Sequence, residues 1–429
     1  MNHSAARPRD QGHAASATAA LYAVMLIASL SYNFSFILID YVRPFLVRTG
    51  AMSLQQTALL YSCQGFGVLA GSFLTPPLVT RRGSKMVLIA SNIVLALGTA
   101  LTLHPVQFEL WAASRLLVGV ALAGSYVSSM TLLANYFPAR IRGRLLSVNM
   151  SMFSVALLMA GAIGIATGGA HWRLFLGVAA ALPIVVVLLT LTFIPGEGSY
   201  TIYGSSDISE PVSPSPGRWH EMFVGSRRAI TLCCIALAGL NFSGYQFYSG
   251  FITTYLLNER HFDAAVVGWF VVVDGVGTLL GSLLWGSIAD RYGRRVVAIA
   301  FGCTTVFITL FLTLPALKPL LILIEFGYAV CLSATNCWAA YFAELFPVRL
   351  RPMGSSLYHG GHVISLAAPF IVTVIARMHS VAAGMALAPI TFGAAALMWW
   401  SLPETLRSGR LYRGFDPDAP PHTLRENLL

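Results

Sequence analysis

Six ionisable side chains lie inside segments that are otherwise apolar. The acids are Asp40, Asp274 and Glu325, and the bases are Arg115, His359 and His362. An ionisable group in a lipid-embedded segment is costly, so it usually faces a water-filled cavity or a charged partner. A carboxyl group in such a cavity can exchange a proton, because a low dielectric favours its neutral form. We expect proton coupling to involve Asp274, Asp40, Glu325 and His362.

A second set of polar side chains could hold a small solute. It comprises Arg115, Asn241, Tyr245, Tyr248, His359 and Gln64. Asn241, Tyr245 and Tyr248 share one helical face, where they supply hydrogen-bond donors and acceptors on an apolar wall. The histidines are three residues apart and share a face as well, which suits an anionic solute or pH sensing. Aromatic packing and hydrogen-bonded packing are the alternatives for these two groups.

Structural roles also remain open for the charged residues. Asp274 could be an interhelical hydrogen-bond acceptor, and Asp40 could pair locally with Arg43. Arg115 and Glu325 lie 210 positions apart, which is also the offset of an internal repeat. They could pair across a cavity, or each could find a partner within its own half of the chain.

No enzyme chemistry is indicated. Two histidines without a third nearby ligand do not predict a metal site. The six cysteines all lie in apolar segments, where packing is their usual role. The sequence has no G-x-x-x-x-G-K-[ST] motif and no polar segment large enough for a nucleotide-binding domain. We therefore expect no cofactor, no metal and no catalytic residues.

The composition indicates a chain embedded in lipid. Of its 429 residues, 56% are hydrophobic and 10% charged, whereas soluble domains carry roughly 25% charged residues. Twelve apolar segments have the length of about 18–25 residues that a membrane span needs. They cover residues 20–42, 55–79, 86–103, 110–134, 145–167, 173–195, 229–256, 265–289, 296–314, 319–342, 354–376 and 381–402. We predict an all-α membrane protein.

Most of the 27 Lys and Arg residues fall in alternate loops and in the two ends of the chain. The positive-inside rule places these segments, and both termini, in the cytoplasm. The net charge of +10 then reflects topology and contact with anionic lipid rather than nucleic acid. We expect a multi-pass protein of the cytoplasmic (inner) membrane that acts as a monomer.

The chain repeats itself in parallel. Residues 64–85 align without a gap with residues 274–295, so that Gly67 and Gly71 match Gly277 and Gly281. Parallel repeats in a membrane protein predict two six-helix bundles that are related by pseudo-symmetry and enclose a solute site. The expected divisions are 1–19 (N-terminus), 20–195 (first bundle), 196–228 (linker), 229–402 (second bundle) and 403–429 (tail).

Several loops resemble motifs of the major facilitator superfamily. The segment from Gly286 to Arg295, which contains Asp290, resembles its G-x-x-x-D-R-x-G-R-R loop. Residues 111–124 resemble the motif of the fourth span, 344–351 the loop after span 10, and 402–405 the end of span 12 in sugar porters and aromatic-acid/proton symporters. The resemblance implies a cytoplasmic gate formed by Asp290, Arg291, Arg294, Arg81, Glu344 and Arg349.

The first half departs from this pattern. Thr80 and Asn135 stand where the family has Asp and Glu, so we expect the gate to be weaker in that half. Ser35 stands where the aromatic-acid symporters have an Asp in span 1.

The resemblance implies a secondary active transporter that works by alternating access. The acids and histidines favour proton-coupled symport of a small organic acid or related metabolite. Proton-coupled drug efflux by antiport is the alternative, although the glycine-rich segment 160–169 lacks the proline common in such exporters. A sensor fits less well, because the tail and the linker are short, and a membrane-embedded enzyme fits less well, because no reactive set of residues stands out.

Overall fold

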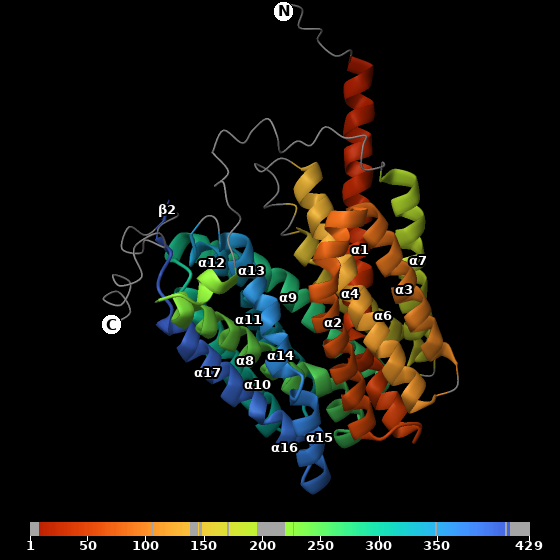
Figure 1. The fold of residues 1–429 in the computed structure, drawn as a ribbon. Helices are drawn as coiled ribbons and strands as arrows, with labels where there is room; N and C mark the ends of the chain where they lie inside the picture. Colours follow the sequence, from red (N-terminus) through yellow and green to blue (C-terminus); the bar gives the residue numbers. More distant parts are fainter. Residues whose placement is uncertain are drawn as a thin grey trace, which may run out of the picture. The chain divides into compact units, whose positions relative to one another are not determined.

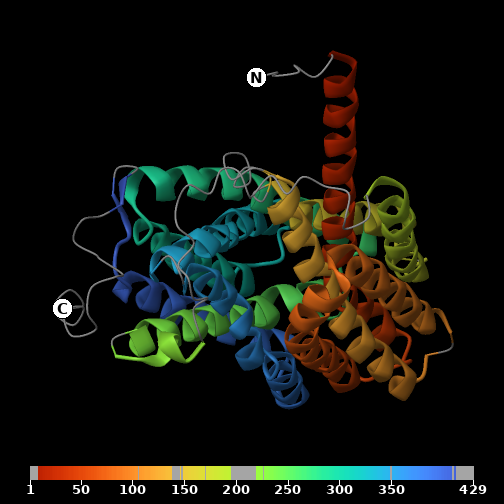
Figure 2. The same ribbon diagram turned by 45° about the horizontal axis from the view of Figure 1, so that its top comes forward.

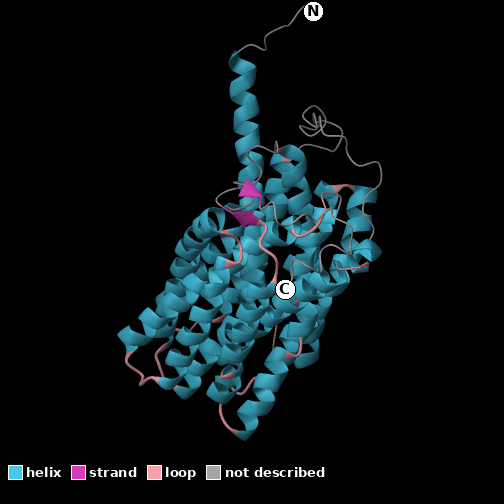
Figure 3. Cartoon of the chain, turned by 90° about the vertical axis from the view of Figure 1, so that its left-hand side faces the viewer, coloured by secondary structure: helices cyan, strands magenta, loops and turns pink. Residues whose placement is uncertain are grey.

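The computed structural model describes residues 8–104, 106–137, 145, 148–169, 171–194, 219–225, 227–347, 350–407 and 410–411. Almost all of the described chain is helical (Figure 3). Eleven of the described helices are long and apolar enough to cross a membrane, and a shorter apolar stretch covers His362–Met378. The predicted all-α membrane architecture is therefore confirmed.

The helices of the first half begin with a long α1. Its elements are α1 (Pro8–Arg48), α2 (Leu54–Arg82), α3 (Ser84–Ala100), η1 (Leu101–Leu103), α4 (Phe108–Tyr136), α6 (Met152–Thr167) and α7 (Arg173–Phe193). They are coloured red to yellow in Figure 1. Within this half α3 packs against both α4 and α7.

Over the described residues, the second half starts with a short 3₁₀ helix and continues through ten α-helices, with two further 3₁₀ segments and one π-helical segment among them. In order they are η2 (Trp219–Phe223), α8 (Arg227–Thr254), η3 (Tyr255–Glu259), α9 (Ala264–Tyr292), η4 (Val296–Ala298), α10 (Ile299–Thr313), α11 (Lys318–Leu332), η5 (Ser333–Cys337), α12 (Trp338–Glu344), α13 (Arg351–Gly360), α14 (His362–Ser365), α15 (Ala368–Met378), α16 (Val381–Met385) and α17 (Leu387–Ser401). The strands β1 (Leu406–Arg407) and β2 (Arg410–Leu411) then pair antiparallel.

The helices of the second half pack around a core rich in aromatic side chains. Helix α17 lies beside α8 and α10, and α11 lies beside α9 and α10, among the elements coloured green to blue in Figure 2. Phe301 contacts Trp338, Phe392 and Trp399 edge-on, with ring centroids 5.3 to 5.4 Å apart. Such edge-to-face pairs add to the stability that burial alone supplies.

The chain divides into two compact units, and the division does not follow the two halves of the sequence. The first unit takes in Met1–Leu38, Phe66–Ala156 and Arg173–Glu210. The second takes in Pro211–Leu429 together with Ile39–Gly65 and Leu157–Trp172. One end of α1, one end of α2 and most of α6 are therefore packed with the C-terminal helices.

The sequence repeat reappears as a repeated helix contact. In the first unit, a Cβ atom at Gly71 would lie 2.7 Å from the carbonyl oxygen of Val120, so only glycine lets α2 approach α4 this closely. In the second unit, Gly281 of α9 meets Val330 of α11 in the same way. Both residues of the second pair lie 210 positions beyond those of the first, so the same interface has been built twice.

The eleventh predicted span, 354–376, is not one continuous helix. It is divided into α13, α14 and α15, with interruptions at Gly361 and at Leu366–Ala367. One interruption coincides with a tertiary contact and the other with a proline. Gly361 lies against the backbone of α8 at Ala238 and Gly239, and Pro369 starts α15 within its first turn, where no amide hydrogen is needed.

Candidate functional site

The three predicted intramembrane acids line one small cavity within the second unit. Asp40 comes from α1, Asp274 from α9 and Glu325 from α11. Polar side chains complete the wall at Tyr41, Tyr245, Ser249 and Thr253, and the rest of the lining is apolar. The cavity measures about 10 Å³, which is room for a single water molecule at most.

Glu325 is held from α8. The phenolic oxygen of Tyr248 donates to its Oε2 across 2.6 Å, and both side chains are fully buried. The ring of Tyr328, one turn along α11, lies 4.5 Å from the ring of Tyr248, and its hydroxyl shares a hydrogen bond of 2.7 Å with Ser249. Two neighbouring residues of α8 are thus hydrogen-bonded to two residues of α11.

Asp40 forms the local pair with Arg43 that the sequence left open. Arg43 Nη2 lies 3.1 Å from Asp40 Oδ1. The guanidinium also donates to the carbonyl oxygen of Gly250 and lies over the ring of Phe251, 4.2 Å from its centroid. Thr253 adds a 2.8 Å hydrogen bond to the carbonyl oxygen of Asp40, so the charged end of α1 is bound to α8.

Asp274 is buried on α9, and one of its carboxyl oxygens, Oδ1, has no hydrogen-bond partner among the described residues. A buried carboxyl oxygen without a donor is expensive unless it carries a proton or meets water. Asp40 Oδ2 is also without a hydrogen-bond partner in the described part of the chain, but Asp40 is paired with Arg43, whereas no ion pair neutralises Asp274 among the described residues.

Arg115 is fully buried on α4 in the first unit. None of its three guanidinium nitrogens has a hydrogen-bond partner within the described residues. An unpaired buried guanidinium carries a large desolvation cost, which an anionic ligand would offset. Its predicted pairing with Glu325 stays a prediction.

Of the other predicted solute contacts whose side chains are described, Tyr245 lines the acid cavity and Tyr248 contacts it through Glu325. Asn241 is buried on α8, and its Oδ1 has no hydrogen-bond partner among the described residues. Gln64 is buried on α2. The imidazole of His362 stacks on the ring of Phe242, with centroids 3.6 Å apart, and does not line the cavity. The side chain of His359 lies outside the described part of the structure.

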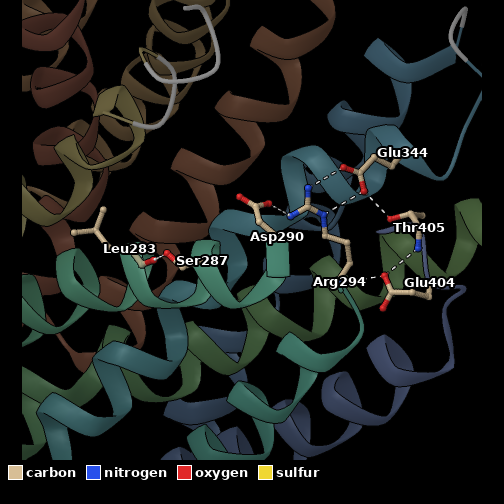
Figure 4. A network of polar contacts seen from close by, with 7 residues as sticks. All are labelled: Leu283, Ser287, Asp290, Arg294, Glu344, Glu404 and Thr405. Carbon is tan, nitrogen blue, oxygen red and sulfur yellow. Dashed lines mark hydrogen bonds and ion pairs between the residues drawn. The ribbon is translucent and has the colours of Figure 1, made fainter. Parts of the chain in front are cut away.

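A second polar site joins four carboxylate and guanidinium side chains at the end of α9 (Figure 4). We call this set, Asp290, Arg294, Glu344 and Glu404 with Thr405, the Arg294 network. Arg294 Nη1 lies 2.9 Å from Asp290 Oδ1, and Arg294 Nη2 lies 2.9 Å from Glu344 Oε1. Glu404 accepts hydrogen bonds from the backbone amides of Arg294 and Arg295, at 2.8 and 3.0 Å. Thr405 donates to Glu344 across 2.6 Å.

The charge of Arg294 is stabilised by its partners. Burial alone would lower the pKa of its guanidinium, but the hydrogen bond and charge of Glu344, followed by those of Asp290, raise it above its ordinary value. The guanidinium is therefore a permanent cation. Arg294 connects the end of α9 to the end of α12 through its side chain, and to the residues after α17 through its backbone amide.

Of the three other predicted gate residues, the structure describes Arg291 and Arg81. Arg291 lies over the ring of Tyr292, 5.4 Å from its centroid, and Arg81 is exposed in the last turn of α2. Arg349 lies outside the described residues, as do the side chains of Thr80 and Asn135. The predicted weakness of the gate in the first half thus stays a prediction.

Sequence reasoning missed several residues of both sites. Tyr328 is one helical turn from Glu325, and Ser249 follows Tyr248, so helical spacing alone could have found them. The sequence distinguishes Glu404 and Thr405 only as part of the family motif at 402–405. In the described part of the chain, no cluster of three or more His, Cys, Asp or Glu side chains is placed to hold a metal ion.

Comparisons with known proteins agree with this architecture. A profile of the Major Facilitator Superfamily matches residues 15–251 and 231–423. The sialic acid transporter NanX of Escherichia coli is 24% identical over 328 residues, covering 74% of this chain and 77% of that protein. The cis,cis-muconate transport protein of Acinetobacter baylyi is also 24% identical over 328 residues, covering 74% and 76%.

The fold is shared with a solved transporter. The crystal structure of a D-xylose-proton symporter superposes with a TM-score of 0.70 at 16% identity, over 92% of this chain and 99% of that one. The profile covers almost the whole chain, and its curated relatives move small solutes across membranes. The chain therefore belongs to the Major Facilitator Superfamily and is a membrane-spanning transporter rather than an enzyme.

Proposed function

We propose that the chain is a proton-coupled symporter of a small organic acid. The observation that carries the proposal is the convergence of Asp40, Asp274 and Glu325 on one buried cavity. Three carboxyl groups in a space that holds at most one water cannot all be ionised, because neighbouring like charges in a low dielectric repel strongly. A shared proton that is gained on one side of the membrane and lost on the other would couple the cavity to a proton gradient.

The relatives support an acidic solute. Their names include transporters of sialic acid, cis,cis-muconate, 4-hydroxybenzoate and niacin, and each of these solutes carries a carboxyl group. In this chain Arg115 supplies a buried cation without a protein partner among the described residues. We propose that it binds the carboxylate of the solute, which would offset its desolvation cost.

Uptake into liposomes that contain the purified protein tests the proposal. We expect labelled 4-hydroxybenzoate to accumulate when the outside is acidic, and protons to enter with it. Asp274→Asn and Glu325→Gln should abolish accumulation driven by the gradient, whereas exchange of labelled for unlabelled solute should continue. Glu109→Gln, which removes an exposed carboxylate at the start of α4, is the matched control and should behave as the wild type.

The result also discriminates between the two functions considered from the sequence. Proton movement opposite to the solute, together with transport of lipophilic cations, would replace symport by drug antiport. Accumulation that ignores the proton gradient in wild type and variants alike would remove proton coupling altogether.

The orientation and assembly of the chain belong to the same proposal. We propose from the loop charges that both termini are cytoplasmic, and we propose that the protein acts as a monomer in the inner membrane. Cysteines introduced near Asp290 and near Arg48 should react with an impermeant reagent from opposite sides of the membrane. Labelling of both from one side would contradict this topology.

A further inference from the structure

The second unit contains a large cavity that is separate from the acid cavity. Its volume is about 860 Å³, within the range of roughly 300–1,000 Å³ that small-molecule sites occupy. The cavity lies where the end of α1, the turn between α6 and α7, the π-helical η3 and the start of α9 meet. The acid cavity cannot hold a solute at about 10 Å³, whereas this one can.

Acidic and basic side chains line this cavity without ion-pair partners among the described residues. Arg48, His261 and Asp263 are exposed, and none of their side chains makes an ion pair or hydrogen bond within the described residues. Asp263 precedes α9 but makes no side-chain cap bond. Ala264 and Ala265 also line the cavity, and amides in the first turn of a helix have no intrahelical partners.

Aromatic rings supply the remaining wall. Phe45, Trp172 and Phe262 line the cavity, and rings of this kind suit the flat faces of an unsaturated or aromatic solute. The turn is tightly built, since a Cβ atom at Gly169 would lie 2.7 Å from a ring carbon of Phe45. The ring of Phe45 therefore lies in close contact with Gly169.

The backbone of His261 is strained. Its φ of 55° places a residue other than glycine in the left-handed region, and no other described non-glycine residue has a positive φ. Strain of this kind persists where the surrounding structure or a function requires a given side chain. Here it holds an imidazole at the rim of the cavity.

We propose that this cavity binds an aromatic carboxylate that also carries a hydrogen-bond donor, as a hydroxybenzoate does. The carboxylate would meet Arg48, His261 and the free amides of α9. The ring would lie among Phe45, Trp172 and Phe262, and the hydroxyl would donate to the carboxylate of Asp263. A simple anion should bind more weakly here, because Asp263 repels it and the anion has no hydroxyl to donate to that carboxylate. This site is additional to the proposed contact between the solute and Arg115, so the inference concerns a second binding event and does not require proton coupling.

Calorimetric titration of the full chain in neutral-lipid nanodiscs tests the site with three probes. We expect 4-hydroxybenzoate to bind more tightly than benzoate, which lacks the donor, and than phenol, which lacks the carboxylate. Arg48→Ala should weaken binding about ten-fold or more, and Arg48→Lys should retain part of it. Arg377→Ala removes an equal charge from the exposed end of α15 and should leave the affinity unchanged.

Two further variants separate this site from the acid cavity and from general misfolding. His261→Gly should weaken binding while the melting temperature is kept or raised, because glycine relieves the strained backbone. The double variant Asp274→Asn, Glu325→Gln should keep the binding, even where it has lost coupled transport. Loss of binding in that double variant, or full affinity in folded Arg48→Ala and His261→Gly proteins, would overturn the inference.

Photolabelling locates the ligand directly. A benzophenone that carries a carboxylate, 4-benzoylbenzoate, should label peptides containing Trp172 or Phe262, and excess 4-hydroxybenzoate should suppress the labelling. Labels confined to other peptides, or labels that no competitor displaces, would also refute the site.

Discussion

Tyr248 donates its phenolic hydrogen to Glu325 Oε2 across 2.6 Å and thereby joins α8 to α11. The helix that carries Asn241 and Tyr245 therefore also positions an acid of the buried cavity. A solute that displaces α8 would change the environment of that acid. This contact gives a direct physical route by which solute binding and protonation could influence each other.

Removing the phenolic oxygen should weaken the protein at this contact. Tyr248→Phe leaves a buried carboxyl oxygen without its donor, which costs about 1–3 kcal/mol of unfolding free energy. Glu325→Gln keeps an acceptor for the tyrosine, so we expect it to be less destabilising although it cannot carry a proton. Thermal unfolding of the purified variants measures the difference. Equal melting temperatures for wild type and Tyr248→Phe would show that the hydrogen bond contributes nothing.

The bond between α1 and α8 depends on Arg43. Arg43→Ala leaves Asp40 as a buried, unpaired acid, and breaking such a pair typically costs about 3–5 kcal/mol. Arg43→Lys keeps the charge but loses the planar guanidinium over Phe251, so an intermediate stability is expected. The double variant Asp40→Asn, Arg43→Gln should recover part of the loss in chemical unfolding, because it removes both charges. A double variant as unstable as Arg43→Ala would contradict this account.

The Arg294 network should depend unequally on its two acids. Asp290 is 71% exposed in its side chain, whereas Glu344 is 18% exposed. Solvent screens the first pair, so Asp290→Asn should cost under about 1 kcal/mol. Glu344→Gln weakens charge-assisted bonds to a mostly buried guanidinium and should cost about 1.5–3 kcal/mol. Unfolding in denaturant compares the two, and the opposite ranking would refute the assignment.

The same network predicts that the contribution of Arg294 to the free energy of unfolding does not change at moderately alkaline pH. The folded-state pKa of Arg294 is raised, so its contribution is complete below the unfolded pKa and is lost only as pH climbs through the folded value. Both pKa values lie above the working pH range of the protein, because an arginine side chain stays protonated throughout it. The stability difference between wild type and Arg294→Gln should therefore be constant from about pH 7 to pH 9. A difference that shrinks over that interval would show that another group carries the effect.

The repeated glycine contact can be tested on one helix. Gly281→Val would drive side-chain atoms into the backbone of α11 at Val330, so we expect α9 and α11 to separate and transport to be lost. Gly286, on the same helix, has open space around it, and Gly286→Ala should be neutral or raise stability by about 0.5–1 kcal/mol. Yield and melting temperature of the two variants give the comparison. A well-folded Gly281→Val protein with normal uptake would remove the close approach from the explanation.

The amino-acid sequence by itself determined the membrane class, the approximate spans and the duplication. Apolar length and loop charge are local properties, and a gap-free repeat needs no coordinates to be recognised. The sequence also singled out Asp40, Asp274 and Glu325, because an acid stands out in an apolar segment. It could not show that the span containing Gly361 is interrupted, since that depends on the close approach of α8.

Only the tertiary structure decided which of these residues meet. Asp40 belongs to the first half of the sequence, yet residues 39–65 pack with the C-terminal helices, and this places Asp40 beside Asp274 and Glu325. The tertiary structure also shows that Arg43 pairs with Asp40, and that Asp274 Oδ1 has no hydrogen-bond partner among the described residues. Helical periodicity fixes neighbours within one helix, whereas contacts between helices depend on how whole surfaces fit, which no local pattern encodes.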